Sequence, residues 1–161
     1  MAIHQTKGKT DEWYTPKYIF DALEVSYFDL DVAHPCQKTF VPALNFYTED
    51  SLNKEWFGFV WMNPPWCKTK SKINWIKKFI NHANGLALMP DSTSSEWWQY
   101  FAKNSDAVLF TSKRVCFIKP DNTKGDSPAN GTTLFAIGEK AVRALKQAEK
   151  NKLGIFLKTH L

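Results

Sequence analysis

Short apolar runs alternate along this chain with segments whose apolar side chains recur at helical spacing. Helical patterns follow Pro16 and cover 73–80, 94–101 and 140–150, and runs typical of buried strands lie at 28–32, 57–62, 86–89, 107–110, 115–118, 133–137 and 155–157. Alternating strands and helices that end in a late hairpin predict an α/β fold, with a mostly parallel sheet and an antiparallel C-terminal hairpin. Ligands of such sheets bind outside the carboxyl ends of the strands.

The segments between these elements predict irregular structure. Residues 36–56 are expected to form a loop with a short helical turn at 51–56. Residues 119–131, rich in Pro, Gly, Asn and Asp, predict a mobile loop between the β-like runs at 115–118 and 133–137. Thr15 is expected to cap the first helix, with Pro16 at its first position. Residues 1–10 are expected to be a flexible tail.

The length of 161 residues suits a single compact domain and is too short for two ordinary ones. With 43% hydrophobic and 23% charged residues, the composition excludes disordered, collagen-like and coiled-coil proteins. No apolar run approaches the roughly 18 residues that span a bilayer, and the N-terminus lacks a signal-peptide core, so we expect a cytoplasmic protein. Three cysteines and four histidines show no ligand spacing, so we expect no metal.

Charge is distributed unevenly along the chain. Residues 1–60 carry nine acidic residues and five lysines, whereas residues 61–161 carry seven acidic residues and sixteen lysines or arginines. An acidic first third and a basic remainder predict one face suited to a polyanion. The alternative is that the surface lysines only provide solubility.

The tetrapeptide Asn63-Pro64-Pro65-Trp66 is the most specific local signal, because it follows an apolar strand directly. Asp31 lies at the end of the preceding predicted strand. The carboxyl ends of parallel strands meet at one edge of a sheet, so both strand tips are expected to face the same cleft. The alternative for the tetrapeptide is a stiff turn whose tryptophan packs on the core.

These residues resemble a known family. The tetrapeptide is similar to the catalytic loop of S-adenosyl-L-methionine-dependent amino methyltransferases that act on adenine N6 or cytosine N4. The wider pattern resembles the small phage DNA N6-adenine methyltransferases, whose fold is a Rossmann-like methyltransferase sheet. The similarity covers about residues 11–137, through Asp11-Glu12-Trp13-Tyr14-Thr15-Pro16, Phe20-Asp21-Ala22-Leu23, the segments 28–33, 49–56 and 60–66, Trp75-Ile76, the strand that ends at Pro90, and 113–117.

The resemblance implies methyl transfer to the adenine N6 amine, whose lone pair is delocalised into the ring. The side-chain oxygen of Asn63 and the carbonyl of Pro64 are expected to grip the amine hydrogens and aim the lone pair at the methyl group. Pro64 and Pro65 hold these acceptors rigid. Trp66 is expected to stack on a base flipped out of double-stranded DNA.

The resemblance also implies a site for S-adenosylmethionine. Tyr14, Thr15 and Pro16 would contact its methionine end, and Asp31 would lie near its amino group. Many relatives have a glycine in the turn after the first strand, whereas this chain has Ala33 and no glycine there. Asp50 is expected to accept a hydrogen bond from the cofactor adenine.

DNA contacts are expected from the basic part of the chain. The candidates for phosphate contacts are Lys68, Lys70, Lys72, Lys113 and Arg114, with Lys77 and Lys78 equally compatible with a solvated helix face. We expect no separate target-recognition domain, so only short loops remain for base reading, and the recognition sequence is expected to be short or relaxed. Two alternatives stay open: a protein glutamine N-methyltransferase, and a catalytically inactive DNA-binding module. The sequence leaves the oligomeric state open, and a phage-encoded enzyme would act in the host cytoplasm.

Overall fold

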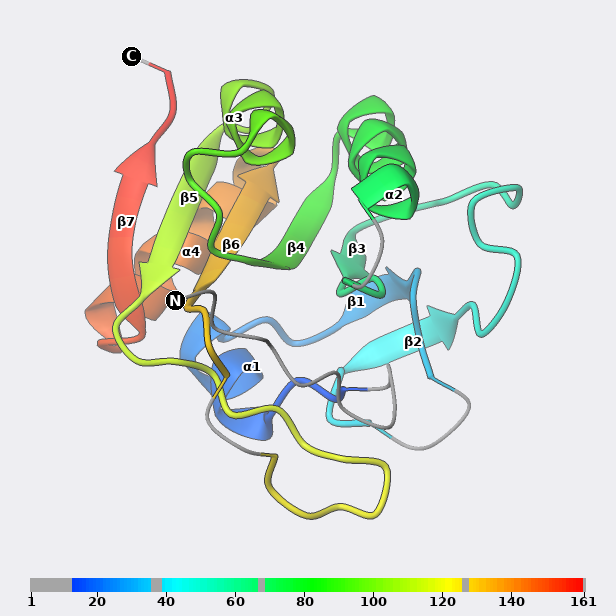
Figure 1. Cartoon of the computed structure of the whole chain (residues 1–161), viewed down its shortest axis with the longest axis horizontal. Helices are drawn as coiled ribbons and strands as arrows, with labels where there is room; N and C mark the ends of the chain where they lie inside the picture. Colours follow the sequence, from blue (N-terminus) through cyan, green and yellow to red (C-terminus); the bar gives the residue numbers. More distant parts are fainter. Residues whose placement is uncertain (1–12, 36–38, 67–68, 126–127, 161) are drawn as a thin grey trace, which may run out of the picture.

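The computed structural model describes residues 13–35, 39–66, 69–125 and 128–160 (Figure 1). The predicted tail at 1–10 therefore lies outside the described residues. Within them, in chain order, the helices and strands are α1 (Lys17–Leu23), β1 (Phe28–Asp31), β2 (Ala43–Phe46), β3 (Val60–Met62), α2 (Thr69–His82), β4 (Gly85–Pro90), α3 (Glu96–Lys103), β5 (Ala107–Thr111), β6 (Thr132–Ile137), α4 (Glu139–Lys150) and β7 (Gly154–Lys158).

The strands form one sheet in the order β2-β1-β3-β4-β6-β5-β7. β2, β1, β3 and β4 are parallel, and β6 is antiparallel to both β4 and β5, so β5 runs in the same direction as the parallel strands. β7 pairs antiparallel with β5 at the far edge. The mostly parallel α/β sheet with antiparallel C-terminal strands that the sequence predicts is confirmed.

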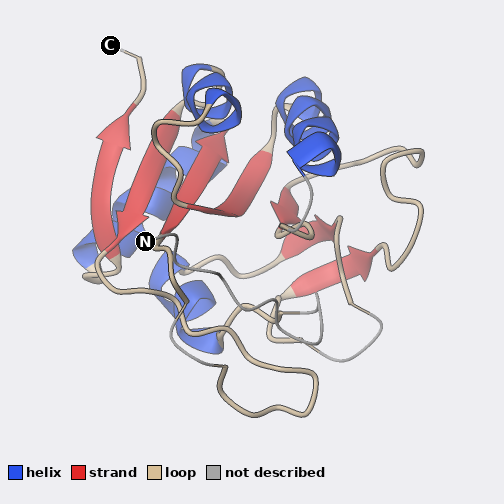
Figure 2. Cartoon of the chain, in the orientation of Figure 1, coloured by secondary structure: helices blue, strands red, loops and turns tan. Residues whose placement is uncertain are grey.

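Helices cover both faces of the sheet (Figure 2). Leu86 and Leu88 of β4 pack in the cluster that includes α1 and α4, whereas Ala87 and Met89 pack in the cluster that includes α2 and α3. Successive side chains of a strand point to opposite faces, so a strand covered on both faces is apolar throughout. For this reason the sequence locates β4 almost to the residue.

The chain changes direction across the sheet between β1 and β3. From β1 it passes to β2 on one side, and it then crosses to β3 on the other side of β1. Asp31 and Trp61 are register partners at this boundary, so Asp31 and Asn63 end neighbouring strands at the same sheet edge. A reversal of strand order in an open α/β sheet opens a crevice at the carboxyl ends of the strands.

Two expectations about strands are wrong. The expected loop at 36–56 contains β2, a four-residue edge strand with three exposed residues, which lacks the apolar alternation that predicts a strand. In the expected strand at 115–118, only Ile118 forms bridges, to Tyr14 on one side and Lys124 on the other. The segment thus belongs to a small ribbon outside the main sheet, and β6 pairs with β5 instead.

The first helix begins later than predicted. Pro16 is its N-cap and Lys17 its first residue, and no side chain caps the helix. The hydroxyl of Thr15 accepts a hydrogen bond from Asn63 instead. The prediction for α3 is confirmed, because Ser95 is the N-cap and its side chain accepts from the Trp98 backbone N–H. Among the described residues, no helix is both long and apolar enough to cross a bilayer.

The candidate active site

A pocket of about 580 Å³ opens at the carboxyl ends of β1, β3 and β4. This volume lies within the usual range for small-molecule sites. Segments distant in the sequence meet there, among them 13–15 before α1, 31–35 after β1, 47–51 after β2, and 63–66 after β3. The pocket lies at the position that the sheet topology predicts.

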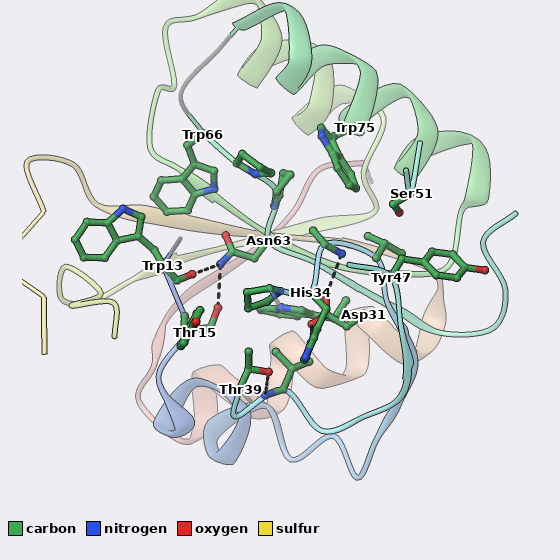
Figure 3. Close-up of a pocket in the computed structure, with 18 of the residues that line it drawn as sticks. Trp13, Thr15, Asp31, His34, Thr39, Tyr47, Ser51, Asn63, Trp66 and Trp75 are labelled. Atoms are coloured by element: carbon green, nitrogen blue, oxygen red, sulfur yellow. Dashed lines mark hydrogen bonds and ion pairs between the residues drawn. The ribbon is translucent and has the colours of Figure 1, made fainter. Parts of the chain in front are cut away.

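Asn63 lies near the centre of this pocket (Figure 3). Trp13 and Trp66 lie on one side of it, and Asp31 and His34 lie on the other. We call the side with Trp13 and Trp66 the aromatic half and the side with Asp31 and His34 the acidic half, to which Tyr47 and Trp75 also belong (Figure 3).

The carboxamide of Asn63 is anchored through its nitrogen. Nδ2 donates to Thr15 Oγ1 at 3.2 Å and to the Trp13 carbonyl oxygen at 3.4 Å. A carbonyl oxygen can only accept, so the Trp13 carbonyl requires the amide nitrogen on this side. No described residue donates to Oδ1 of Asn63, which is left to accept from a ligand.

The segment that carries Trp13 and Thr15 is held next to Asn63 by backbone hydrogen bonds to a segment far away in the sequence. The N–H of Tyr14 donates to the Ile118 carbonyl at 2.9 Å, and the N–H of Ile118 donates to the Tyr14 carbonyl at 2.9 Å. This bridge places Thr15, whose side chain is buried, against the loop after β3. The hydroxyl that was expected to cap α1 therefore contacts Asn63.

The rest of the tetrapeptide shapes the aromatic half. Pro64 is buried and Pro65 is exposed. The ring of half-buried Trp66 packs edge-on against Phe117, with centroids 5.0 Å apart at an interplanar angle of 88°. Its Nε1 is buried and has no hydrogen-bond partner among the described residues. Trp66 therefore contacts its neighbours through its ring surface and not through a hydrogen bond of Nε1.

Asp31 organises the turn after β1. Its Oδ1 accepts from the Ala33 N–H at 3.2 Å, and its Oδ2 lies 2.9 Å from Nδ1 of His34. The His34 ring stacks on Phe46 of β2, with centroids 4.4 Å apart. No described residue of this turn has a positive φ, so the backbone forms it without the glycine of many relatives.

Asp50 enters the pocket on a turn in which its own φ is +53°. Its Oδ1 accepts from Asn53 Nδ2. Lys78 of α2 holds the same turn, donating to the carbonyls of Leu52, at 2.9 Å, and Lys54. Burial lowers the pKa of Lys78, an effect that the Asp50 carboxylate opposes. Lys78 thus supports the turn that carries Asp50.

The pocket has an acidic lining. Asp31, Glu49 and Asp50 line it, whereas Lys72 is the only lysine or arginine among the described lining residues. Lys72 is 8% exposed, and its ammonium lies 4.5 Å from the centroid of the Trp97 ring. This balance favours a ligand that carries positive charge.

Comparison with known proteins identifies the family of this pocket and fold. A protein-family model described as DNA N-6-adenine-methyltransferase (Dam) matches residues 3–153. The chain belongs to this family. Comparisons with curated proteins and with solved structures find no match. Membership supports an enzyme that methylates adenine in DNA, and it argues against the glutamine methyltransferase.

The structure brings most of the predicted site residues of this methyltransferase together. The pocket lining includes all four residues of the tetrapeptide and also Tyr14, Thr15, Asp31, Ala33, Asp50 and Lys72. Pro16 instead lines a second cavity, together with Lys113 and Arg114. Lys70 lies in the first turn of α2, and Lys68 lies outside the described residues.

Sequence reasoning missed several residues of the methyltransferase pocket. His34 follows the predicted strand by only two residues, and its spacing from Asp31 is the signal that marks it. Tyr47 follows β2, which was not predicted, and Trp13 and Phe117 meet only through the Tyr14–Ile118 bridge. No local pattern marks Tyr47, and the resemblance that covers Trp13 and Phe117 gave neither of them a role in the site. Among the described residues, no group of three potential ligands for a metal is present.

Proposed function

We propose that this methyltransferase transfers the methyl group of S-adenosylmethionine to N6 of an adenine flipped out of double-stranded DNA. The observation that carries the proposal is the anchored carboxamide of Asn63. Because Thr15 and the Trp13 carbonyl hold Nδ2, Oδ1 is presented to a ligand in a fixed orientation. An oriented acceptor of this kind is what an unreactive aromatic amine requires.

In this proposal Asn63 Oδ1 and the Pro64 carbonyl accept the two N6 hydrogens of the target adenine. Both are acceptors, so together they recognise an amine and exclude a carbonyl at the same position. Proline has a restricted φ and no N–H, so the backbone of the loop keeps the Pro64 carbonyl in place. With both hydrogens held, the nitrogen lone pair is available for the methyl group.

The acidic half of the pocket fits S-adenosylmethionine, which supplies an activated methyl group when bound. The cofactor carries a sulfonium and an ammonium group, and the pocket offers the carboxylates of Asp31 and Asp50. We assign Asp31 to the ammonium group and Asp50 to the cofactor adenine. Tyr14, Thr15 and Ala33 line the same cavity and would contact the methionine portion of the cofactor. Pro16 lines the second cavity, so it would act only by holding the backbone of the preceding residues, Tyr14 and Thr15, in position.

The aromatic half of the pocket would receive the target base. Trp66 offers a ring face, which is a surface on which any flipped base can stack. For the flanking DNA, we propose phosphate contacts by Lys68, Lys70, Lys113 and Arg114. Lys72 lies in the pocket itself, so we place its contact at the phosphate next to the flipped nucleotide.

The proposal is tested by nucleoside mass spectrometry of DNA from cells that express the protein, together with calorimetric titration of the purified protein with S-adenosylmethionine. We expect 6-methyladenine in the DNA and saturable binding of the cofactor. The appearance of 4-methylcytosine alone would overturn the choice of base. Cofactor binding without any modified DNA base would overturn the choice of substrate.

Thr15→Val should lower kcat about tenfold, because it removes one of the two acceptors that orient Asn63. Valine has the same shape as threonine, so folding and the Michaelis constant for DNA should stay unchanged. Thr15→Ser retains the hydroxyl and should restore most of kcat. Steady-state kinetics of both variants measures this. A Thr15→Val variant with wild-type kcat would show that Asn63 needs no support from Thr15.

The recognition sequence should be short or relaxed, because the strands form one sheet, and only the loops that connect its strands and helices are available to read bases. Phosphate contacts by lysines supply affinity without sequence information. Single-molecule sequencing of DNA methylated to completion by the purified protein measures the site. A strictly modified site of five or more base pairs, made by the monomer, would contradict this expectation.

A further inference from the structure

A second cavity, of about 950 Å³, lies at the carboxyl end of β5. Its walls come from the start of α1, the segment after β5 and the turn before β7. Four exposed cationic side chains line it, and the only carboxylate among its described lining residues, Asp21, is paired with Lys17. We call this cavity the basic groove, and its cationic residues are Lys113, Arg114, Lys124 and Lys152.

The basic groove and the active-site pocket lie along the same edge of the sheet. β5 and β3 run in the same direction, so their carboxyl ends face the same edge. β4 and β6 lie between them, which makes three strand spacings. At about 4.8 Å per spacing, the ends of β3 and β5 are about 14 Å apart.

A thin wall separates the two cavities. It is the ribbon formed by the Tyr14–Ile118 bridge, on which Phe117 lines the active-site pocket while Cys116 and Ile118 line the groove. Adjacent residues of an extended segment point to opposite sides, which explains this division. A polymer that enters the pocket with one unit can therefore cross the wall and continue into the groove.

We propose that the basic groove holds the sugar-phosphate backbone of the DNA about four nucleotides from the target adenine. With the axis of the duplex along the sheet edge, the separation of about 14 Å spans about four base pairs, because each base pair rises about 3.4 Å along that axis. This inference rests on the proposed function, because it gives the same DNA a second point of attachment. It also names Lys124 and Lys152 as DNA contacts.

The chemistry of the groove matches a phosphodiester backbone. Neutral donors accompany the cations, among them Tyr18, Ser112 and Asn122. Burial, with a smaller contribution from Cys116, raises the pKa of Tyr18, so its phenol stays protonated and can donate to phosphate oxygen. The acidic pocket and the basic groove thus separate the tasks of binding a cationic cofactor and a polyanionic substrate.

Lys124→Gln/Lys152→Gln tests the groove, because both lysines are exposed and line it, and Lys103→Gln/Lys158→Gln is the matched control. Lys158 pairs with Ala107 at the start of β5, whereas Gly154 pairs with Thr111 at its end, so Lys158 lies at the opposite sheet edge. Lys103 ends α3 just before β5 begins. Both control lysines are exposed, and the two double variants remove the same charge. Arg114 is left intact, because its Nη1 donates to the Pro128 carbonyl at 3.2 Å.

The groove variant should weaken duplex DNA binding about tenfold or more at 150 mM salt, and its slope of log K against log salt should fall by about two units. The control variant should keep the wild-type slope within half a unit. Equal slopes for the two double variants would overturn the proposal.

A duplex with neutral methylphosphonate linkages three to five nucleotides from the methylated adenine provides the second measurement. These linkages, placed on one side of the adenine, should weaken binding of the wild type and leave the groove variant almost unaffected. If neutral linkages on either side of the adenine weakened duplex binding, and the two losses of binding free energy added, the assignment of these phosphates to the groove would be overturned. A wild-type protein that binds duplex DNA but transfers no methyl group would instead refute the proposed function.

Discussion

Asn63→Ala should lower the rate of methyl transfer by a factor of about 10² to 10³, which is typical for loss of one preorganised hydrogen bond to the reacting group. The substitution removes Oδ1, for which no described residue offers a replacement in the pocket. It leaves Asp31 and Asp50 in place, so affinity for S-adenosylmethionine should remain unchanged. Single-turnover transfer of radiolabelled methyl groups to duplex DNA measures the rate, and calorimetry measures the affinity.

Asn81→Ala is the matched control, because Asn81 is exposed on α2 and does not line the pocket. It should transfer methyl groups at the wild-type rate. If Asn63→Ala also retained that rate, Asn63 would have no part in holding the amine. If cofactor affinity fell together with the rate, Asn63 would act on the cofactor side of the pocket instead.

Trp66→Ala should lose most activity, whereas Trp66→Phe should retain a substantial part of it. Stacking of a base on an aromatic ring contributes about 1–3 kcal/mol, which corresponds to a loss of about five- to 150-fold when the ring is removed. Nε1 of Trp66 has no partner among the described residues, so replacement by phenylalanine leaves no polar group unpaired. The Michaelis constant for DNA and kcat of the two variants give the comparison.

Loss of packing has to be separated from loss of stacking, because Trp66 also contacts Phe117. The thermal midpoint of each variant and its affinity for S-adenosylmethionine serve this purpose. A folded Trp66→Ala protein that binds the cofactor and methylates DNA as well as Trp66→Phe would place Trp66 in the core only. A fluorescent adenine analogue at the target site should brighten with the wild type if the base is flipped.

The sequence by itself determined the order of the helices and of every strand except β2, and the position of the tetrapeptide 63–66. β4 and α3 were predicted closely, because a strand buried on both faces is continuously apolar and Ser95 marks the start of its helix. These signals depend on neighbours within a few residues. The tetrapeptide is local in the same way, so it also indicated the family that the comparison confirmed.

Only the tertiary structure decided which residues surround the tetrapeptide. β2 is an exposed edge strand, and what holds it is its pairing with β1 rather than any pattern of its own. Thr15 reaches Asn63 because Tyr14 pairs with Ile118, about a hundred residues along the chain. Pairing between distant backbone segments leaves no periodic mark in either segment, because its hydrogen bonds join main-chain groups that every residue carries.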